Sequence, residues 1–180
     1  MPHHPSSRLA ITPSVSLRLY GDDDAELVAR TAAHSLAHLQ PWMSWATPEA
    51  VSWESQLARH EERLAHAESG QDYMYLLVEG DLLHGVLGLH RRVGPAAVEI
   101  GYWLRPESVG QGLVTRAVAA LTAEALELPD VERVEIHCDE ANVRSAAVPA
   151  RLGYRLDHVE DDGVQAPAEV GRGLVWVYPA

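Results

Sequence analysis

The sequence contains no lysine, a single cysteine and no long hydrophobic run. All 14 basic residues are therefore arginine, against 26 acidic residues, and the formal net charge is -12. Nucleic acids and anionic membranes attract clustered positive charge, so a field of this sign counts against both as partners. The same field favours a cationic or amine-bearing substrate.

The single cysteine, Cys138, has no second cysteine with which to form an internal disulfide. A zinc site built on paired cysteines is excluded for the same reason, and we expect no metal. The chain has neither a signal-type apolar segment nor about 18 consecutive apolar residues. These absences predict a cytoplasmic protein that does not span a membrane.

The length of 180 residues and the hydrophobic content of 47% fit one compact domain. We therefore expect a single domain over residues 1–180, with residues 1–12 forming a loose N-terminal segment. The polar segment over residues 161–169, which contains glycine and proline, is expected to be a mobile surface loop.

Hydrophobic periodicity predicts strands that alternate with helices. One helix is expected from the acidic cluster at residues 22–24 to Pro41, and a second from Thr47 to about Gly70, with Trp53 in the core. Further helices are expected over residues 112–126 and 145–152. The expected strands cover residues 15–20, 73–78, 82–89, 98–104, 131–138, 154–159 and 174–178. This pattern is typical of an α/β fold, a mixed sheet with helices on its faces.

The segment with the clearest chemical signature joins the strand that ends at Leu104 to the next helix. It reads Arg105-Pro106-Glu107-Ser108-Val109-Gly110-Gln111-Gly112-Leu113-Val114-Thr115. Glycines permit a tight turn, and the first amides of a helix have no intrahelical partner and favour an anion. An ordinary loop before a helix is the alternative, because short glycine motifs occur by chance. The groups that could hold a pyrophosphate belong to Gly110, Gln111, Gly112, Val114 and Thr115.

Five segments occur in a characteristic order: Leu39–Trp42, Glu99–Leu104 with Pro106, Gly110–Thr115, Asn142–Ser145 and Arg151–Tyr154. Together and in this order they resemble the GNAT family of acetyl-CoA-dependent N-acetyltransferases, in particular its RimJ/RimL-like branch. The resemblance implies a mostly antiparallel twisted sheet of about 6–7 strands, with helices on both faces and a splay between its two central strands. It also implies that acetyl-CoA is the cosubstrate, with its pyrophosphate in the glycine loop and its pantetheine beside Trp103 and Leu104, and it adds Asn142 to the CoA site.

Four positions depart from the pattern of the family. Val109 stands where Arg or Gln is usual, Val114 where Gly or Ala is usual, and Arg116 where Glu is frequent. Pro149 lies within the expected short helix and cannot donate a hydrogen bond to the carbonyl of Ser145. We therefore expect this helix to be kinked, or to start later than in relatives.

The implied reaction is direct attack of a neutral amine on a thioester, and it needs three groups. A base must deprotonate the amine, a donor must meet the oxyanion, and the leaving thiolate must be protonated. The resemblance gives the last role to Ser145, whose alternative role is to cap the helix. Cys138 has no evident activating base, so an acyl-cysteine route is disfavoured.

Two residues are candidates for the base. Glu99 lies on a central strand, where a carboxylate is costly to bury, so it either faces a cleft with a raised pKa or forms an ion pair with Arg91 or Arg92. The resemblance makes His137 the second candidate, since some amino-terminal acetyltransferases use a histidine on the corresponding strand. A structural role for His137 is the alternative.

The acceptor pocket is expected beside Trp42 and Trp45, whose aromatic faces with acidic neighbours suit a cationic amine. Asp139 and Glu140 either add to that charge or form a solvated turn, and we expect the turn.

Three functions follow from these patterns. The first is an N-acetyltransferase that acts on a peptide N-terminus or a small amine. The second is a non-catalytic CoA-binding module, suggested by the departures at Val109, Val114 and Pro149, and the third is an antibiotic-modifying self-resistance enzyme. A homodimer is possible if the strand at 174–178 pairs across a sheet edge.

Overall fold

The computed structural model describes residues 4–179, so the expectations for residues 1–3 and 180 lie outside the described residues. Within these residues, eight strands form a single sheet in the order β1-β2-β3-β4-β5-β6-β8-β7. The sheet is mixed and mostly antiparallel, as expected, and has slightly more strands than predicted. The strands are β1 (Arg8–Ala10), β2 (Ser16–Leu19), β3 (Asp72–Glu79), β4 (Leu82–His90), β5 (Ala97–Leu104), β6 (Arg133–Asp139), β7 (Arg155–Asp161) and β8 (Arg172–Tyr178).

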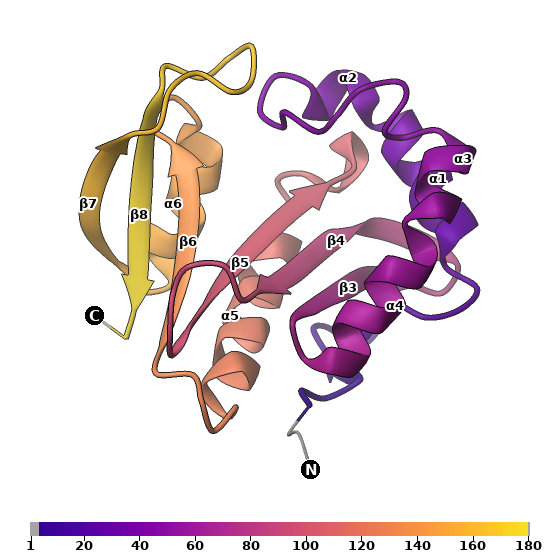
Figure 1. Ribbon diagram of the computed structural model, residues 1–180, viewed down its shortest axis with the longest axis horizontal. Helices are drawn as coiled ribbons and strands as arrows, with labels where there is room; N and C mark the ends of the chain where they lie inside the picture. Colours follow the sequence, from indigo (N-terminus) through magenta and orange to yellow (C-terminus); the bar gives the residue numbers. More distant parts are fainter. Residues whose placement is uncertain (1–3, 180) are drawn as a thin grey trace.

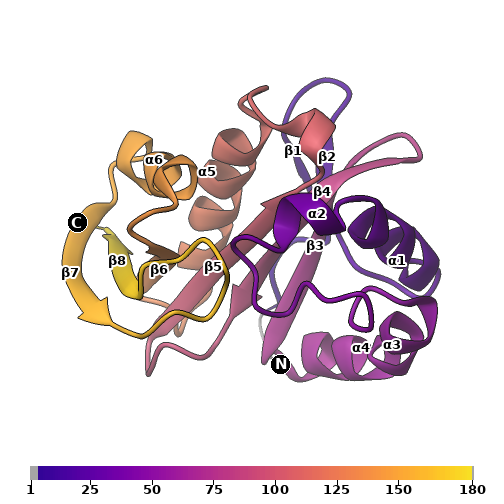
Figure 2. The same cartoon turned by 90° about the horizontal axis from the view of Figure 1, so that it is seen from above.

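Helices cover both faces of this sheet (Figures 1 and 2). The first four helices lie on one face and the last two on the other, which confirms the predicted α/β architecture. The helices are α1 (Ala25–His34), α2 (Leu36–Leu39), α3 (Trp53–Ala58), α4 (His60–Ser69), α5 (Leu113–Leu126) and α6 (Val143–Arg151), with a 3-10 turn η1 (Pro106–Ser108) before α5.

The N-terminal half differs from the expected elements in two respects. Residues 8–10 form β1, which pairs antiparallel with β2, so the prediction of a loose segment is wrong for these residues. The helix expected from Thr47 begins only at Trp53, where the Ser52 hydroxyl accepts a hydrogen bond from the Ser55 amide at 3.2 Å. Gln56 is buried and Trp53 is 48% exposed, so the core prediction for Trp53 is wrong.

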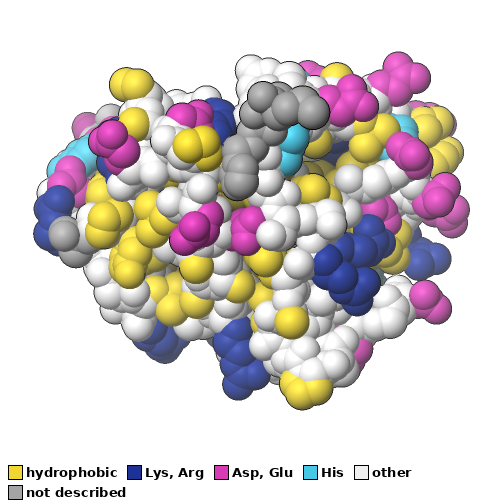
Figure 3. All heavy atoms as spheres, turned by 90° about the horizontal axis from the view of Figure 1, so that it is seen from below, with side chains coloured by type: hydrophobic (Ala, Val, Ile, Leu, Met, Phe, Trp, Pro, Cys, Tyr) yellow, Lys and Arg dark blue, Asp and Glu magenta, His cyan; other side chains and the backbone are white. Residues whose placement is uncertain are grey.

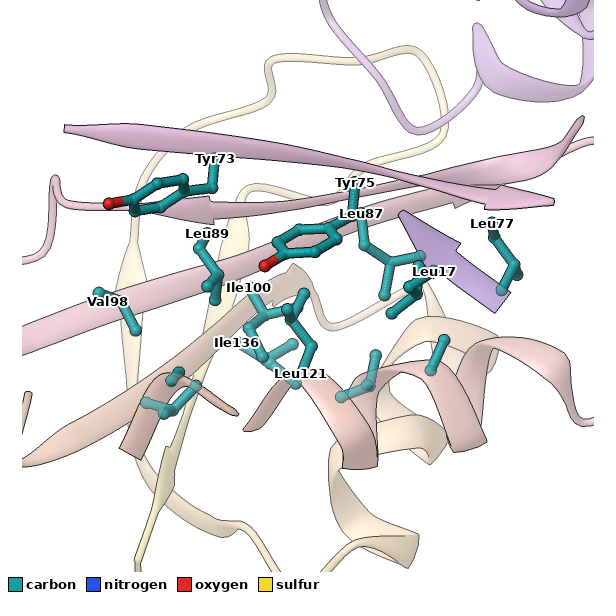
Figure 4. Close-up of a cluster of buried hydrophobic side chains, with 14 of the residues drawn as sticks. Leu17, Tyr73, Tyr75, Leu77, Leu87, Leu89, Val98, Ile100, Leu121 and Ile136 are labelled. Atoms are coloured by element: carbon teal, nitrogen blue, oxygen red, sulfur yellow. The ribbon is translucent and has the colours of Figure 1, made fainter. Parts of the chain in front are cut away.

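The main hydrophobic core lies between the sheet and α5 (Figure 4). Leu121 projects from α5 against Ile100 of β5 and Ile136 of β6, and all three side chains are buried. Complete burial of an aliphatic side chain of this size contributes about 1.5–3 kcal/mol. A smaller cluster around Leu76 and Val28 lies on the other face of the sheet and holds α1.

The sheet is held together across its centre by a very short parallel pairing. Residues 97–99 of β5 pair with residues 133–135 of β6, and these are the paired residues of the two strands in the described structure. Beyond this joint β5 continues beside β4, and β6 continues beside β8 (Figure 1). The splay implied by the family resemblance is therefore confirmed.

The last strand of the chain is internal. β8 lies between β6 and β7, with β7 at the edge of the sheet. The predicted pairing of residues 174–178 across a sheet edge is therefore wrong, because both sides of β8 are already paired. Within residues 4–179, no helix combines the length and the hydrophobicity that a membrane crossing requires. On the face seen in Figure 3, arginine side chains are separated by acidic and hydrophobic ones.

Candidate active site

A cleft of about 550 Å³ lies where β5 and β6 diverge. Its floor is the sheet, one wall is formed by α3, α4 and the loop after α2, and the other by α6 and the loop after β7. The carbonyl of Pro41 accepts a hydrogen bond from the amide of Ala168 at 2.9 Å, which joins the two loops at the rim. The cleft brings together many of the residues selected from the sequence: Trp42, Trp45, Glu99, Trp103, His137, Asn142 and Ser145.

Aromatic side chains form one side of the cleft. The rings of Trp45 and Trp103 have centroids 6.3 Å apart and planes tilted by 53°. Leu104 follows Trp103 on β5 and points to the opposite face, because successive strand residues alternate. Its side chain is buried in the main core, so it lies outside the cleft where the family resemblance had placed it.

The glycine loop ends at an exposed helix N-terminus. Gly110 and Gly112 have φ values of 81° and 72°, in the left-handed region that favours glycine, and a Cβ added at either would meet nothing within 4 Å. The amide of Arg116 bonds the Gly112 carbonyl at 3.3 Å, so the preceding helical amides have no intrahelical acceptor. This open turn with free amides fits a pyrophosphate group.

Two departures from the family pattern are explained by the core. Val109 and Val114 are both partly buried and pack against the main hydrophobic cluster. Their side chains anchor the loop from below, while Gly110 and Gly112 form its exposed surface. The valines therefore leave the backbone of the turn accessible.

Glu99 forms an ion pair on the cleft floor. Its two carboxylate oxygens accept from Nε and Nη2 of Arg92 at 2.7 and 2.8 Å. Burial on its own favours the neutral acid, but the Arg92 hydrogen bonds and charge outweigh it, so the pKa of Glu99 lies below its ordinary value. The ion-pair alternative is thus the one observed, with Arg92, and the expectation of a raised pKa is wrong.

His137 also has a carboxylate partner. Its Nε2 lies 2.8 Å from Oε2 of Glu135, whose other oxygen accepts from Nε of Arg133 at 2.7 Å. Glu135 is buried, and the His137 side chain is partly exposed to the cleft. The imidazole is therefore held through its distal nitrogen.

Ser145 is free of the capping role considered as its alternative. Asn142 is the N-cap of α6, and its Oδ1 accepts from the Ser145 amide at 3.2 Å. The Ser145 hydroxyl lies in the first turn and faces the cleft. The helix begins at Val143, two residues before the expected residue 145, and contains Pro149.

Tyr102 compensates for the hydrogen bond that Pro149 cannot make. The carbonyl of Ser145 would normally accept from the amide of residue 149, and proline has none. The Tyr102 hydroxyl donates to this carbonyl at 3.1 Å and lies 3.1 Å from the Ser145 hydroxyl. Burial raises the pKa of Tyr102, so its hydroxyl stays protonated as a donor. Sequence reasoning missed this role.

Two further predictions concern Cys138 and Asp139 beside the cleft, and the structure agrees with the first and contradicts the second. Burial raises the pKa of Cys138 to about 11, which agrees with its exclusion as a nucleophile. Asp139 is buried, and its Oδ2 accepts from the backbone amides of residues 170, 171 and 172. The expected solvated turn is therefore wrong for Asp139, which anchors the loop before β8.

Sequence reasoning also missed a pair at the end of the cleft. Nδ1 of His90 lies 2.5 Å from Oδ1 of Asp72, and both residues line the cleft. His90 ends β4 one residue beyond the predicted strand. The glycines at positions 85 and 88 were the available signal, because glycine within a strand marks a close approach.

Comparison with known proteins agrees with this geometry. Residues 15–155 match the Acetyltransferase (GNAT) domain family. The chain is 29% identical over 157 residues to "Putative ribosomal N-acetyltransferase YdaF" of Bacillus subtilis (strain 168), with 86% of this chain and 85% of that protein covered. It is 24% identical over 152 residues to a ribosomal-protein-serine acetyltransferase of Escherichia coli (strain K12), with 83% of each covered.

Among solved structures, the fold is similar to that of RimL, a ribosomal L7/L12 alpha-N-protein acetyltransferase in complex with coenzyme A. The TM-score is 0.85 at 22% sequence identity, with 94% of this chain and 96% of that chain covered. The family match, the splayed sheet and the open glycine turn lead to one conclusion: the chain belongs to the GNAT family and is an N-acetyltransferase that uses acetyl-CoA.

Proposed function

We propose that the acceptor is the α-amino group of a protein or peptide N-terminus. The proposal is supported by the two curated relatives, which are named for acetylation of ribosomal proteins. The observation that carries it is the cleft itself, which opens between β5 and β6 and is walled by Trp42 and Trp45. Aromatic faces near carboxylates suit an ammonium group at the end of an extended chain.

Each part of the cosubstrate has a fitting part of the protein. The amides of residues 110–115 bind the pyrophosphate, with Gln111 held by a hydrogen bond from its Nε2 to the Glu107 carbonyl at 2.7 Å. Trp103 and Asn142 flank the pantetheine from the two sides of the splay. Acetyl-CoA supplies an acetyl group already activated as a thioester.

Ser145 donates the proton that the leaving thiolate needs. Its hydroxyl is released from capping by Asn142, and its backbone is fixed by Tyr102. Glu99 is ionised and its charge is balanced by Arg92, so this pair shapes the floor of the cleft without adding net charge to it.

The experiment follows thiol release with acetyl-CoA and a synthetic peptide that has an N-terminal serine. The matched control is the same peptide with its N-terminus already acetylated and an internal lysine left free. We expect release only with the free N-terminus, confirmed by a mass increase of one acetyl group. Ser145→Ala should lower kcat and leave KM for acetyl-CoA unchanged. Acetylation of small amines with none of the peptide would refute the proposed acceptor.

The proposed acceptor bears on the cellular location of the enzyme, whereas its oligomeric state is a separate prediction. Acetylation of a ribosomal protein would take place in the cytoplasm, and we propose that compartment for the enzyme. A homodimer stays a prediction, and light scattering of the purified protein tests it. Such a dimer would have to form without backbone pairing through β8, because both edges of β8 are already paired.

A non-catalytic CoA-binding module is the weaker candidate. Its support was the unusual residues at positions 109, 114 and 149. The two valines anchor the loop against the core, and Tyr102 satisfies the carbonyl that Pro149 leaves without a partner. These substitutions are therefore accommodated in the structure, and they leave the catalytic interpretation intact. Coenzyme A binding without turnover on any amine would restore the alternative.

A further inference from the structure

Four neighbouring strands place ionisable residues in one row across the cleft floor. The sheet register pairs Asp72 with His90, His90 with Glu99, and Glu99 with Glu135. Residues directly opposite each other on paired strands point to the same face of the sheet. The row ends at the joint where β5 and β6 begin to diverge, which is where the cleft opens.

The imidazole of His90 is held so that its distal nitrogen is the free one. Nδ1 lies 2.5 Å from Oδ1 of Asp72, an arrangement in which Nδ1–H donates to the carboxylate. In the neutral imidazole this leaves Nε2 with its lone pair, and within residues 4–179 no hydrogen-bond partner contacts Nε2. A quarter of the His90 side chain is exposed, and the residue lines the cleft.

Two glycines allow the ring to lie across the sheet. A Cβ at Gly88 would stand 2.3 Å from Nε2 of His90, and one at Gly101 would stand 3.2 Å from the same atom. Any side chain at residue 88 would therefore displace the imidazole. Because Gly101 is on β5 just beyond the joint, Nε2 reaches from β4 over the strand that borders the splay.

The other candidate bases are occupied. Both oxygens of Glu99 accept from Arg92. His137 contacts Glu135 through Nε2 and keeps only Nδ1, the nitrogen nearer its own backbone. His90 is the candidate that combines a carboxylate partner on one nitrogen with a free distal nitrogen, which is the arrangement expected of an oriented general base.

We propose that His90 is the general base of acetyl transfer and that Asp72 is its positioning residue. The amine nitrogen bonds to the acetyl carbon as the carbon–sulfur bond breaks, and Nε2 of His90 takes the proton that the nitrogen loses. The thiolate receives one proton from Ser145. Proton exchange with water returns the imidazolium and the serine to their starting states. The assignment builds on the acetyltransferase activity and holds for any acceptor amine.

Several charged and titratable groups face His90 in the cleft. Asp72 comes from β3, Glu99 from β5, His137 from β6, and Arg92 from the segment after β4. Arg63 and His66 of α4 line the same cleft. The Arg92 hydrogen bonds and charge hold the pKa of Glu99 below its ordinary value against the effect of burial, so this carboxylate is ionised at neutral pH.

Kinetics of three variants provide the first test. With the N-terminal serine peptide, or otherwise with whichever amine the wild type acetylates, His90→Gln should lower kcat by about 10²–10⁴-fold. KM for acetyl-CoA should not change. Asp72→Asn should lower kcat less, because the amide oxygen can still accept from Nδ1–H. His158→Gln is the matched control, because Nδ1 of His158 also lies beside a carboxylate oxygen, 3.0 Å from Oδ2 of Asp157, but on the edge strand β7 and outside the cleft lining. This variant should retain wild-type kcat.

Chemical rescue and the pH profile separate catalysis from structural damage. Free imidazole should restore part of the activity of His90→Ala, and kcat/KM of the wild type should rise with pH through a limb that His90→Gln lacks. Urea unfolding checks that each variant is folded. A His90→Gln variant with wild-type kcat, or one that keeps the rising limb, would overturn the assignment.

A measurement independent of the acceptor tests the tautomer. In nitrogen-15 spectra of histidine-labelled wild type, with the His90 signals assigned through His90→Gln, the neutral form of the ring should carry its proton on Nδ1 and leave Nε2 bare. A neutral His90 ring protonated on Nε2 would overturn the proposal even if no peptide is acetylated. Failure of the peptide assay with the expected tautomer would refute the proposed acceptor and leave the base assignment standing.

Discussion

At the scale of single residues, the active site depends on how one proline is accommodated. Pro149 removes the amide that the Ser145 carbonyl would use, and the Tyr102 hydroxyl replaces it from the neighbouring strand. A buried carbonyl left without a partner costs about 1–3 kcal/mol. The tyrosine therefore supports α6 at the position where its serine faces the cleft.

This compensation can be measured by a double-mutant cycle. Tyr102→Phe should destabilise the protein by about 1–3 kcal/mol, because the Ser145 carbonyl loses its donor. In the Pro149→Ala background the restored amide of residue 149 can bond that carbonyl, so the same substitution should cost less than about 1 kcal/mol. Urea unfolding gives the four free energies. Equal costs in the two backgrounds would show that the tyrosine and the proline are not coupled.

At the scale of elements, the loop before α5 and the start of α1 illustrate two ways of fixing a helix N-terminus. α5 begins at an exposed left-handed glycine with no side-chain cap. α1 begins after Asp24, whose carboxylate accepts from Nη1 and Nη2 of Arg18, both at 2.6 Å, and from the Gly21 amide at 2.8 Å. The first arrangement leaves amides available to a ligand, and the second consolidates the joint between β2 and α1.

The substitution Gly112→Ala tests whether the N-terminus of α5 binds acetyl-CoA. The new Cβ would meet nothing within 4 Å, so the cost comes from the left-handed backbone, about 1–2 kcal/mol. If the turn shifts to relieve that strain, KM for acetyl-CoA should rise by about tenfold, which corresponds to about 1.4 kcal/mol. Gly80→Ala is the matched control, since Gly80 has a φ of 56° and equal space in the turn between β3 and β4. It should lower stability without changing KM.

The substitution Asp24→Asn tests how the carboxylate at the start of α1 stabilises the fold, and the pH dependence of stability is the measurement. Burial alone favours the neutral acid, but the Arg18 and Gly21 hydrogen bonds hold the pKa of Asp24 below its ordinary value. A carboxylate with a lowered folded pKa stabilises the fold above its unfolded pKa of about 3.9, and this contribution is lost as pH falls through the folded pKa. We expect the wild type to be more stable than Asp24→Asn by about 1.5–3 kcal/mol at pH 7.

The unfolding free energies of the wild type and Asp24→Asn should converge in acid. Urea unfolding at pH 7, 5 and 3 should show a difference that is constant between pH 7 and 5 and smaller at pH 3. A difference that does not change with pH would mean that the Asp24 carboxylate is not the stabilising group.

At the scale of the whole molecule, the sheet consists of two parts with a short parallel joint. The larger part runs from β1 to β5, and the smaller contains β6, β8 and β7. Beyond the joint, residues 100–104 and 136–139 face each other across the cleft without backbone pairing. A ligand in this cleft contacts both parts.

Coenzyme A should therefore stabilise the fold as a whole. At 100 times its Kd, the free energy of unfolding should rise by about 2.7 kcal/mol, which corresponds to a Tm increase of about 5–11 °C for a chain of this size. Hydrogen exchange should slow at residues 100–104 and 136–139 in particular. A Tm increase with unchanged exchange in these segments would place the ligand elsewhere.

Local patterns predicted much of this molecule. The start of α5 was predicted within one residue, and the motifs that contain Trp103 and Ser145 led to two walls of the cleft. Relationships between distant segments were not predicted. Asp72 and His90 are 18 residues apart and meet only through the register of β3 and β4. β8 lies between β6 and β7, an order that hydrophobic alternation does not specify.

Short or context-dependent features were missed for a different reason. β1 has only three residues, too few for a periodic signal. Pro149 has a low helix propensity, but the Tyr102 hydroxyl supplies the hydrogen bond that it cannot donate, so the helix forms around it. The pKa of Glu99 depends on Arg92, which the sequence offered as one of two possible partners. Burial and long-range pairing, rather than residue type, decided each of these cases.

The brevity of the central joint has a consequence for how variants of this enzyme will be interpreted. Val98 and Val134 face each other in that joint and are fully buried, far from the glycine turn along their strands. A smaller side chain at either position would let the two parts of the sheet drift apart. Assays would record this as weaker acetyl-CoA affinity, although neither valine need touch the molecule whose binding is lost.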